Sequence, residues 1–466
     1  MKAKWKISFV LLTMVTFLSA CFGGKQALAP LKDGKEKIKV VYRNERQFNE
    51  DYGQFFSVKY PNIDVEVIPI MSGDHPLNFY GVEKEDEERV KEIIEQHKPD
   101  VLLLNEDLLT SYAQEGKLYS LDEVIVQDQF DLTGYMPGLI DSLRAKGKGK
   151  LYGLIPSLEA AVLYYNRDLF TENNIEFPRN QMTWEEVFNL SKRFQGIGTG
   201  KNKVYGLYQM SLSEISNAWF FYDVAKTSPL RMFDAKAKKF LIHTDGWKKV
   251  FELTTDAIRS QAVSFYDPNG DVANFLAFQS GKAAMTISNS WIIPELENPR
   301  SFNGQPAKKI NWDIVTVPID PQNPDESAEV RFGGIYAVSA NSPNKRAAWE
   351  FVKFANGTEM EKISSRSTGK PFPTRNQVFK ELHGRSVEPF YKLKPMVYSS
   401  DVLSHVNVPE EFYRLYTPLL EDTLRAIVDN KITVDEALAE LQVKGQNALE
   451  QARAAKKRED NSKTAE

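Results

Sequence analysis

The chain has a single cysteine, Cys21, among its 466 residues. No intrachain disulfide can form, and a chain of this length does not need one because it can bury a large core. The sequence also lacks HExxH, CxxC and GxSxG patterns, and its five histidines are scattered. We therefore find no signature of a zinc protease, a redox dithiol or an α/β-hydrolase, and we expect neither a metal nor another cofactor.

Long apolar runs and an excess of positive charge are missing as well. An extended apolar run occurs only near the N-terminus, and no later segment approaches the roughly 20 apolar residues that a helix needs to cross a bilayer. The formal net charge is −4, and the sequence has no basic stripe of the kind that marks nucleic-acid-binding proteins. With 42% hydrophobic and 12% aromatic residues, the composition is that of a globular protein long enough for two or three domains.

The N-terminus has the layout of a secretory signal peptide. Three lysines at the front are followed by an uncharged, apolar-to-small run over residues 7–20, which is too short for a transmembrane helix but fits a cleaved leader. Leu18-Ser-Ala-Cys21 resembles the bacterial lipobox, in which the cysteine receives a diacylglycerol and the chain is cut just before it. We expect residues 1–20 to be removed and Cys21 to anchor the protein through its acyl chains. The alternative is that Cys21 is a small buried hydrophobic residue.

The sequence after the leader indicates the α/β class. Residues 21–37 are rich in Gly, Ala, Pro and Lys and are predicted to form a flexible tether. Strands are predicted over residues 38–42, 65–68 and 101–104, with helical segments between them. The last of these strands is wholly apolar, as in a parallel sheet buried on both faces, and alternating strands and helices predict such a sheet.

Four shorter patterns bear on local structure. Thr183-Trp-Glu-Glu186 predicts a helix that begins with a capping box. Gly196–Lys201 resembles a phosphate loop only faintly, since it lacks the four-residue spacing and the Ser/Thr after the lysine, so a plain loop is favoured. Asp267–Asp271 resembles a calcium loop but has the wrong ligand spacing, and Asp271 is more simply a helix N-cap. The nearly all-polar residues 456–466 predict a disordered tail.

Aromatic residues and carboxylates remain as candidates for a binding site. Trp219 lies in a run of four aromatic residues, and Trp291 follows the polar Ser288-Asn-Ser290. Aromatic faces stack on the C–H faces of sugar rings, and carboxylates accept hydrogen bonds from the hydroxyl groups. Either tryptophan could instead be a core residue, and the pattern alone leaves both possibilities open.

Several blocks of the sequence resemble the family 1 extracellular solute-binding proteins, the group of maltose-binding protein. They occur in the family's order and together span about residues 39–441. The blocks are Asp100–Leu104 with Tyr112–Gly116 behind it, Leu151–Phe170 followed by Thr183–Glu186, Phe278–Met285 leading into Trp291, and Phe332–Lys345.

The resemblance implies a two-lobed, periplasmic-binding-protein-like α/β fold with a cleft between the lobes and three interlobe crossings. The crossings are expected near Leu158–Ala160, Ile314–Ile319 and Lys370–Asn376. The N-terminal lobe would comprise residues 38–157 and 319–370, and the C-terminal lobe residues 161–315 and 376–455.

The family's cleft residues are carried over by position. Glu159 matches a ligand-binding carboxylate, Asp107 matches a hydroxyl-binding aspartate, and Trp291 matches a stacking tryptophan. Trp219 falls in a region that supplies another aromatic ring, and Tyr416 lies near the position of a third. The resemblance therefore implies that these five residues contact the ligand.

The sequence also departs from the maltose-binding pattern. Leu104 stands where the maltose binder has tryptophan, and Arg43–Arg46 replaces an Asp-Lys pair after the first strand. These departures argue against maltodextrin specificity but leave a sugar as the favoured ligand. Asn44, Glu45 and Asn105 follow predicted strands at their C-terminal ends, where open α/β sheets bind ligands, and complete the candidate site.

The resemblance implies a lipid-anchored protein that delivers a carbohydrate, most simply an oligosaccharide, to the permease subunits of an ABC importer by cleft closure. It would be a monomer on the extracytoplasmic face of the cell membrane, without catalysis. One alternative is a surface glycoside hydrolase with Glu159 and Asp107 as its carboxylate pair. Another is a protein of the same fold that presents its ligand to a membrane sensor. The identity of the solute stays open, since polyamines, phosphorylated polyols and iron bind to related folds.

Overall fold

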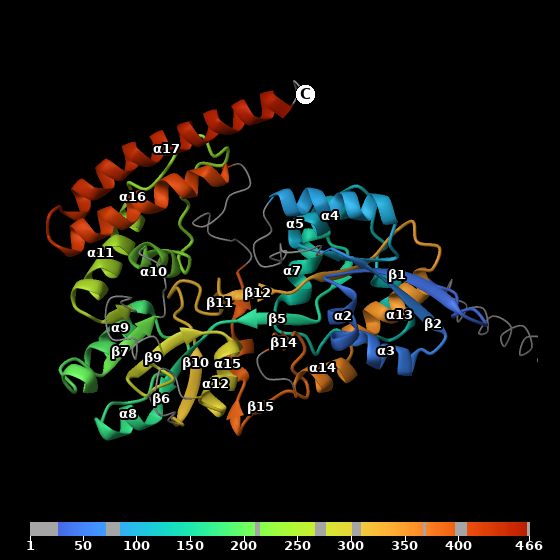
Figure 1. Cartoon of the computed structure of the whole chain (residues 1–466), viewed down its shortest axis with the longest axis horizontal. Coiled ribbons are helices and arrows are strands. Elements are labelled where there is room, and N and C mark those ends of the chain that lie inside the picture. Colours follow the sequence, from blue (N-terminus) through green and yellow to red (C-terminus); the bar gives the residue numbers. More distant parts are fainter. Residues whose placement is uncertain are drawn as a thin grey trace, which may run out of the picture. The chain divides into compact units, whose positions relative to one another are not determined.

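The computed structural model describes residues 27–70, 84–209, 215–265, 276–300, 309–366, 370–396 and 408–463. The predicted signal peptide, the lipidation site at Cys21 and the segment Asp267–Asp271 lie outside these residues. The chain forms two compact units (Figure 1). Unit 1 comprises Met1–Tyr135, Ile140–Ser157 and Phe332–Lys362, and unit 2 comprises Met136–Leu139, Leu158–Arg331 and Ile363–Glu466.

Unit 1 is built on a five-stranded sheet with the order β2-β1-β3-β13-β4. Its strands are β1 (Glu36–Tyr42), β2 (Ile63–Pro69), β3 (Val101–Leu104), β4 (Gly153–Leu154) and β13 (Ile335–Val338). β1 is parallel to β2 and β3, whereas β13 is antiparallel to β3 and β4. All four residues of β3 are buried, as its continuous apolar sequence predicts.

Helices accompany the strands of unit 1. They are α2 (Glu45–Phe48), the π-helix η1 (Asn49–Gly53), α3 (Gln54–Lys59), α4 (Lys84–His97), α5 (Glu106–Gln114), α6 (Asp122–Gln127), α7 (Leu139–Lys146), α13 (Lys345–Ala355) and α14 (Thr358–Ser364). Aromatic rings join α3 to α13, since the centroids of Phe56 and Phe351 lie 5.3 Å apart in an edge-on arrangement that aromatic pairs prefer.

Unit 2 contains a second five-stranded sheet, with the order β10-β6-β9-β7-β8. Its strands are β6 (Val162–Asn166), β7 (Tyr205–Gln209), β8 (Val263–Phe265), β9 (Ala283–Ser288) and β10 (Trp312–Thr316). β7 is parallel to β8 and β9, and β6 is antiparallel to β9 and β10. The carboxyl ends of β7 and β9 therefore lie at the same edge of this sheet.

Helices of unit 2 contribute to a large hydrophobic core rich in aromatic residues. The helices of this unit are α8 (Arg167–Glu172), α9 (Trp184–Lys192), η2 (Gly200–Asn202), α10 (Ser216–Ala225), α11 (Asp245–Arg259), η4 (Ser290–Ile292), α12 (Ile293–Glu297), α15 (Glu388–Lys392), α16 (Glu410–Val428) and α17 (Val434–Lys463). Of these, α8, α9, α10, α11, α16 and α17 contribute to the core. α16 and α17 lie side by side (Figure 1). The predicted capping box is confirmed: the Thr183 hydroxyl accepts from the Glu186 amide, and the Glu186 carboxylate accepts from the Thr183 amide.

Three small sheets complete the fold. β12 (Val330–Phe332), β5 (Ser157–Ala160) and β14 (Phe372–Pro373) form one sheet, β11 (Glu326–Ser327) pairs with β17 (Lys394–Pro395), and β15 (Glu381–Leu382) pairs with β16 (Arg385–Ser386). The chain passes from unit 1 to unit 2 within β5 and returns within β12.

Two of the expected crossings differ from the unit boundaries. Apart from the short segment Met136–Leu139, which is grouped with unit 2, the chain returns to unit 1 after Arg331 rather than at Ile314–Ile319 and passes again to unit 2 after Lys362 rather than at Lys370–Asn376. Residues 319–331 stay with unit 2 because the Ile319 amide donates to the carbonyl of Met182 at 2.9 Å, and because β11 pairs with β17. The boundary after Ser157 adjoins the expected Leu158–Ala160.

The two predicted flexible ends are shorter than expected. β1 begins at Glu36, within the predicted tether. At the other end α17 continues to Lys463, although residues 456–466 were expected to be disordered. Ala, Lys, Arg and Glu dominate residues 452–459 and are all strong helix formers, so the helix extends past the last residue that packs on the core, Ala452. Among the described helices, none has the length and apolar character to cross a bilayer.

Candidate ligand-binding site

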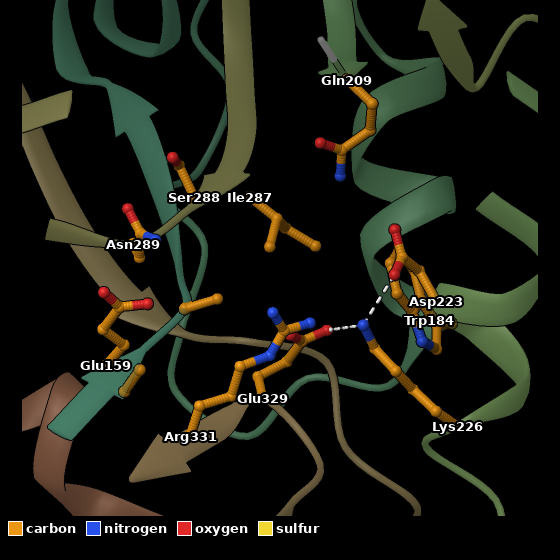
Figure 2. A pocket seen from close by; sticks show the side chains of 12 residues that line it. Glu159, Trp184, Gln209, Asp223, Lys226, Ile287, Ser288, Asn289, Glu329 and Arg331 are labelled. Atoms are coloured by element: carbon orange, nitrogen blue, oxygen red, sulfur yellow. Dashed lines mark hydrogen bonds and ion pairs between the residues drawn. The ribbon is translucent and has the colours of Figure 1, made fainter. Parts of the chain in front are cut away.

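A polar cavity of about 260 Å³ lies within unit 2, at the carboxyl ends of two parallel strands (Figure 2). Gln209 is the last residue of β7, and Ser288 is the last residue of β9. The cavity is also lined by Glu159 from β5 and by Arg331 from β12. Carboxyl ends of parallel strands are the usual position of ligand sites in α/β sheets, so this cavity is the candidate site.

A cluster of three charges is fixed in the cavity wall. The Lys226 ammonium, at the C-terminal end of α10, lies 2.6 Å from a carboxylate oxygen of Asp223 and 2.6 Å from one of Glu329 (Figure 2). Burial alone would lower the pKa of Lys226, but Glu329 and Asp223 more than offset it, so the pKa is raised and the ammonium stays charged. Burial raises the pKa of the Asp223 carboxyl, and Lys226 opposes this shift.

The charged cluster leaves hydrogen-bonding capacity for a ligand. Lys226 engages one oxygen of each carboxylate, and the second oxygens of Asp223 and Glu329 make no hydrogen bond with another described residue. Arg331 is exposed in the same cavity. Its charge helps to lower the pKa of Asp223, which burial raises, but its guanidinium makes no direct hydrogen bond or ion pair with a described residue. A ligand with several hydroxyl groups could therefore donate to the carboxylates and accept from the guanidinium.

Trp291 is held in a defined orientation beside the cavity. Its indole N–H donates to a carboxylate oxygen of Glu159 at 3.0 Å, and its backbone amide donates to the Asn289 side chain at 3.0 Å. Tyr164 in turn donates its hydroxyl proton to the carbonyl of Asn289 at 2.8 Å. Trp291 is nevertheless 49% exposed, so the structure places it as a fixed aromatic surface rather than as a core residue.

Trp219 shares a face of α10 with Asp223 and Lys226, two residues that line the cavity. It precedes Asp223 by four residues and Lys226 by seven, a spacing that places the three side chains along one face of a helix. Trp219 is 45% exposed, and its ring meets that of Tyr222 edge-on at 6.0 Å. The aromatic face of Trp219 therefore continues the polar stripe of the cavity along α10.

Trp184 contributes a buried donor to the cavity wall. It is the first residue of α9, it is 5% exposed, and it lines the cavity next to Asp223 (Figure 2). Its indole N–H has no hydrogen-bond partner among the described residues. Because an unsatisfied buried donor costs free energy, this group favours the entry of a hydrogen-bond acceptor.

The four candidates from unit 1 lie where helices begin after β1 and β3. Asn44 and Asn105 are the N-caps of α2 and α5, and their side-chain oxygens accept from the amides of Gln47 and Leu108. Glu45 and Asp107 are exposed in the first turns of these helices, where acidic side chains are favoured by the helix dipole. Helix capping thus accounts for the orientation of the two asparagine side chains. The two carboxylates are exposed to solvent.

Tyr416 is not at a ligand surface, contrary to its expected position. It is fully buried in α16, where its ring stacks on Phe412 at 5.2 Å and meets Phe240 at 5.0 Å. The amphipathic pattern of α16 directs this residue into the core of unit 2. Of the sequence-predicted residues in unit 2, Glu159 lines the cavity, Trp291 is hydrogen-bonded to Glu159, Trp219 shares a helix face with two lining residues, and Tyr416 is buried in the core.

Sequence reasoning missed most of the polar lining. Lys226, Asp223, Glu329 and Arg331 were not singled out, and neither was Gln209. Their proximity depends on segments far apart in the sequence. One available signal was the spacing of Asp223 and Lys226 behind Trp219 on one helix. No group of three or more His, Cys, Asp or Glu suited to a metal ion occurs in the described part of the chain.

Known proteins resemble this chain over most of its length. A mannitol-binding protein of Pseudomonas aeruginosa is 22% identical over 401 residues, 76% of this chain and 88% of the relative. A maltooligosaccharide ABC transporter solute-binding lipoprotein of Streptococcus pneumoniae is 23% identical over 385 residues, 81% of this chain and 82% of the relative.

Solved structures share the two-lobed fold. A sugar transporter from Rhizobium etli, in an open conformation, has a TM-score of 0.61 at 18% identity and covers 88% of this chain and 99% of its own. The sugar-binding protein MalE from Xanthomonas citri has a TM-score of 0.60 at 17% identity, with 91% and 99% covered. The family profile described as "Bacterial extracellular solute-binding protein" matches residues 81–384. The chain therefore belongs to the family of bacterial extracellular solute-binding proteins.

Proposed function

We propose that the protein captures a carbohydrate outside the cytoplasm and delivers it to an ABC importer. The observation that carries this proposal is the polar cavity of unit 2 with Trp291 fixed beside it. Carboxylates, a guanidinium and amide groups suit vicinal hydroxyls, and an exposed indole suits the apolar face of a sugar ring. Relatives named for maltooligosaccharide and mannitol support the same ligand class. The family consists of solute-binding proteins rather than enzymes, so the hydrolase hypothesis is not retained.

Capture would involve both units. Glu45 and Asp107 of unit 1 are exposed carboxylates, and Asn44 and Asn105 lie beside them in sequence. In a two-lobed binding protein the ligand draws the lobes together and is then contacted by both. We propose that these four side chains supply the contacts of unit 1 to the sugar, and that permease subunits recognise the closed form of the monomer.

The proposal includes attachment to the outer face of the cell membrane through Cys21. The lipobox-like sequence before this cysteine supports the anchor, and so does the word lipoprotein in the name of the Streptococcus pneumoniae relative. Cys21→Ser should leave the signal peptide in place and abolish lipidation, because only the thiol can receive the diacylglycerol. Mass spectrometry of the membrane-extracted protein checks both outcomes, and a free thiol on an intact chain would contradict the anchor.

Ligand class can be tested by a thermal-shift screen of the purified protein. The panel should contain maltooligosaccharides of several lengths, other oligosaccharides, mannitol, a polyamine and a phosphorylated polyol. A ligand that binds only the folded state stabilises it by about 2.7 kcal/mol at a hundredfold excess over Kd. A shift with one saccharide series and none with the polyamine or the phosphorylated polyol is expected. A shift confined to the non-sugar compounds would refute a carbohydrate cargo.

The cavity itself can be tested by removing its free guanidinium. Arg331→Met keeps the aliphatic length but removes every donor, and hydrogen bonds to a charged group contribute about 1.5–3 kcal/mol. Sugar affinity should fall about ten- to a hundredfold in titration calorimetry. Arg193→Met is the matched control, because Arg193 is exposed on unit 2 and pairs with Glu176 outside the cavity. Equal affinities for the two variants would place the sugar elsewhere.

A further inference from the structure

A residue of the predicted tether is attached to the fold. The backbone amide of Leu28 donates to the side-chain oxygen of Gln127 at 3.0 Å, and the side-chain nitrogen of Gln127 donates to the carbonyl of Leu28 at 2.8 Å. One amide side chain thus pairs with both polar groups of one backbone residue, as a neighbouring strand would. Gln127 is the last residue of α6, and both residues belong to unit 1.

This attachment shortens the free part of the tether. Seven peptide steps separate Leu28 from Cys21 and span at most about 25 Å, whatever their conformation. Without the pair, the next segment held in the sheet is β1, which begins at Glu36. Fifteen steps separate Glu36 from Cys21 and span up to about 54 Å. The Gln127 pair therefore halves the distance that unit 1 can move from its point of attachment.

The surface around this point has both apolar and charged side chains. Val126, next to Gln127 on α6, is an apolar residue with 77% of its surface exposed. On the other side of Gln127, the Asp128 carboxylate receives hydrogen bonds from Arg346, Trp349 and Lys353. The negative charge of Asp128 is thereby paired with cations, whereas Glu123, one turn before Gln127 on α6, is an exposed carboxylate.

We propose that Gln127 is a clip that fixes where the tether leaves the protein, so that the α6 end of unit 1 faces the lipid surface. This inference rests on the lipid anchor of the proposed function, and it is independent of the sugar that is bound. The pair restricts the orientation of unit 1 at the membrane. The protein can rotate about residues 21–28, but the end of α6 stays within about 25 Å of Cys21.

The test uses the lipidated full chain on vesicles of phosphatidylethanolamine and phosphatidylglycerol. Cys21 is the only cysteine and is blocked by the lipid, so Val126→Cys creates a unique site for a donor dye. Acceptor dye is placed on the lipid headgroups. Gln127→Ala in this background should lower energy transfer clearly, because the reach of the tether doubles. Gln114→Ala is the matched control: Gln114 is exposed at the end of α5, and its replacement should leave transfer unchanged.

A second measurement follows the pair itself. Hydrogen exchange at the Leu28 amide should accelerate about tenfold in Gln127→Ala, the effect of losing one such hydrogen bond. If energy transfer and hydrogen exchange are both unchanged in Gln127→Ala, the clip is refuted. It is also refuted if exchange accelerates but energy transfer does not change, since the pair would then not orient the protein. If the unmodified chain does not float with vesicles, the anchor fails and the clip fails with it. Sugar affinity, measured on the same samples, tests the transport proposal separately.

Discussion

Trp291 combines two properties that are usually separate in a tryptophan. Its ring is half exposed, yet hydrogen bonds to Glu159 and Asn289 fix its orientation. A ring that is already ordered loses little conformational entropy when a ligand binds to it. An ordered, exposed indole beside a polar cavity is what a stacking site for a sugar ring requires.

Trp291→Ala should weaken sugar binding about ten- to a hundredfold, since stacking on an aromatic ring contributes roughly 1–3 kcal/mol. The free energy of unfolding of the empty protein should change little, because the ring is only half buried. Titration calorimetry and a melting curve on one variant give both quantities. Phe55→Ala, at an exposed aromatic position of α3, is the control for general surface effects. A loss of about 3–5 kcal/mol in stability with affinity retained would identify a core residue instead.

Tyr416 allows a sharper test of a buried hydroxyl. Its hydroxyl oxygen has no hydrogen-bond partner among the described residues, whereas the hydroxyl of neighbouring Tyr222 lies 3.2 Å from that of Thr417. Tyr416→Phe removes an unsatisfied polar group and should leave the free energy of unfolding equal or up to about 1 kcal/mol higher, while Tyr222→Phe should lower it by about 1 kcal/mol. Urea titrations measure both. A loss of sugar affinity in Tyr416→Phe would restore its predicted role in the site.

These residues show what a sequence can and cannot predict about a site. Glu159 and Trp291 could be proposed because each lies in a sequence block that resembles the family, at a position that carries a ligand-binding residue there. Tyr416 could not, because whether an aromatic residue of an amphipathic helix faces the core or the ligand depends on the rotation of the helix. Lys226 and Glu329 are more than one hundred positions apart, and only the folded chain shows that they form an ion pair.

At the scale of elements, one carboxylate joins α6 to α13. Asp128, directly after α6, receives hydrogen bonds from Arg346 at 2.9 Å, from Trp349 at 2.9 Å and from Lys353 at 2.7 Å. Burial alone would raise the pKa of Asp128, but these donors lower it to about 2. The unfolded chain should titrate near 3.9, so the native state favours the ionised carboxylate.

Asp128 should therefore stabilise the fold at neutral pH by about 1–2 kcal/mol, and this contribution should disappear as the pH falls from about 4 to about 2. Asp128→Asn should lower the free energy of unfolding at pH 7, and its difference from the unmodified protein should shrink at pH 2.5. Urea unfolding at both pH values measures the effect. Asp429→Asn, which breaks an exposed pair with Lys431, should have little effect at either pH. If Asp128→Asn lowers the free energy of unfolding equally at both pH values, the loss comes from packing rather than from the charge of Asp128.

Elements were more predictable than their grouping into units. The strand at residues 101–104, the capping box at Thr183 and the alternation of strands and helices all follow from local sequence. The boundary after Arg331 does not, because residues 319–331 are held in unit 2 by β17, a strand from much later in the chain. Similarly, the polar composition of residues 456–466 suggested disorder, whereas helix propensity and the preceding packed turns of α17 extend the helix.

At the scale of the whole molecule, the proposed function requires that a bound sugar favour a closed arrangement of the two units. A ligand can shift such an equilibrium only through its differential affinity for the two states. Two half-exposed tryptophans and the exposed guanidinium of Arg331 in unit 2 should offer contacts in either state, so we expect the difference to come from unit 1, where Glu45 and Asp107 are exposed. Closure should then depend on these two carboxylates more than binding does.

Small-angle scattering of the purified protein should accordingly show a smaller radius of gyration at saturating sugar than without it. The double variant Glu45→Gln, Asp107→Gln should retain measurable sugar binding through unit 2 but lose most of this decrease, because the contacts that favour the closed form are weakened. Glu123→Gln, at an exposed carboxylate of α6, is the matched control and should close normally. A scattering profile that does not change in the unmodified protein at saturation would exclude closure. A double variant that closes fully would instead show that unit 1 recognises the sugar through other groups.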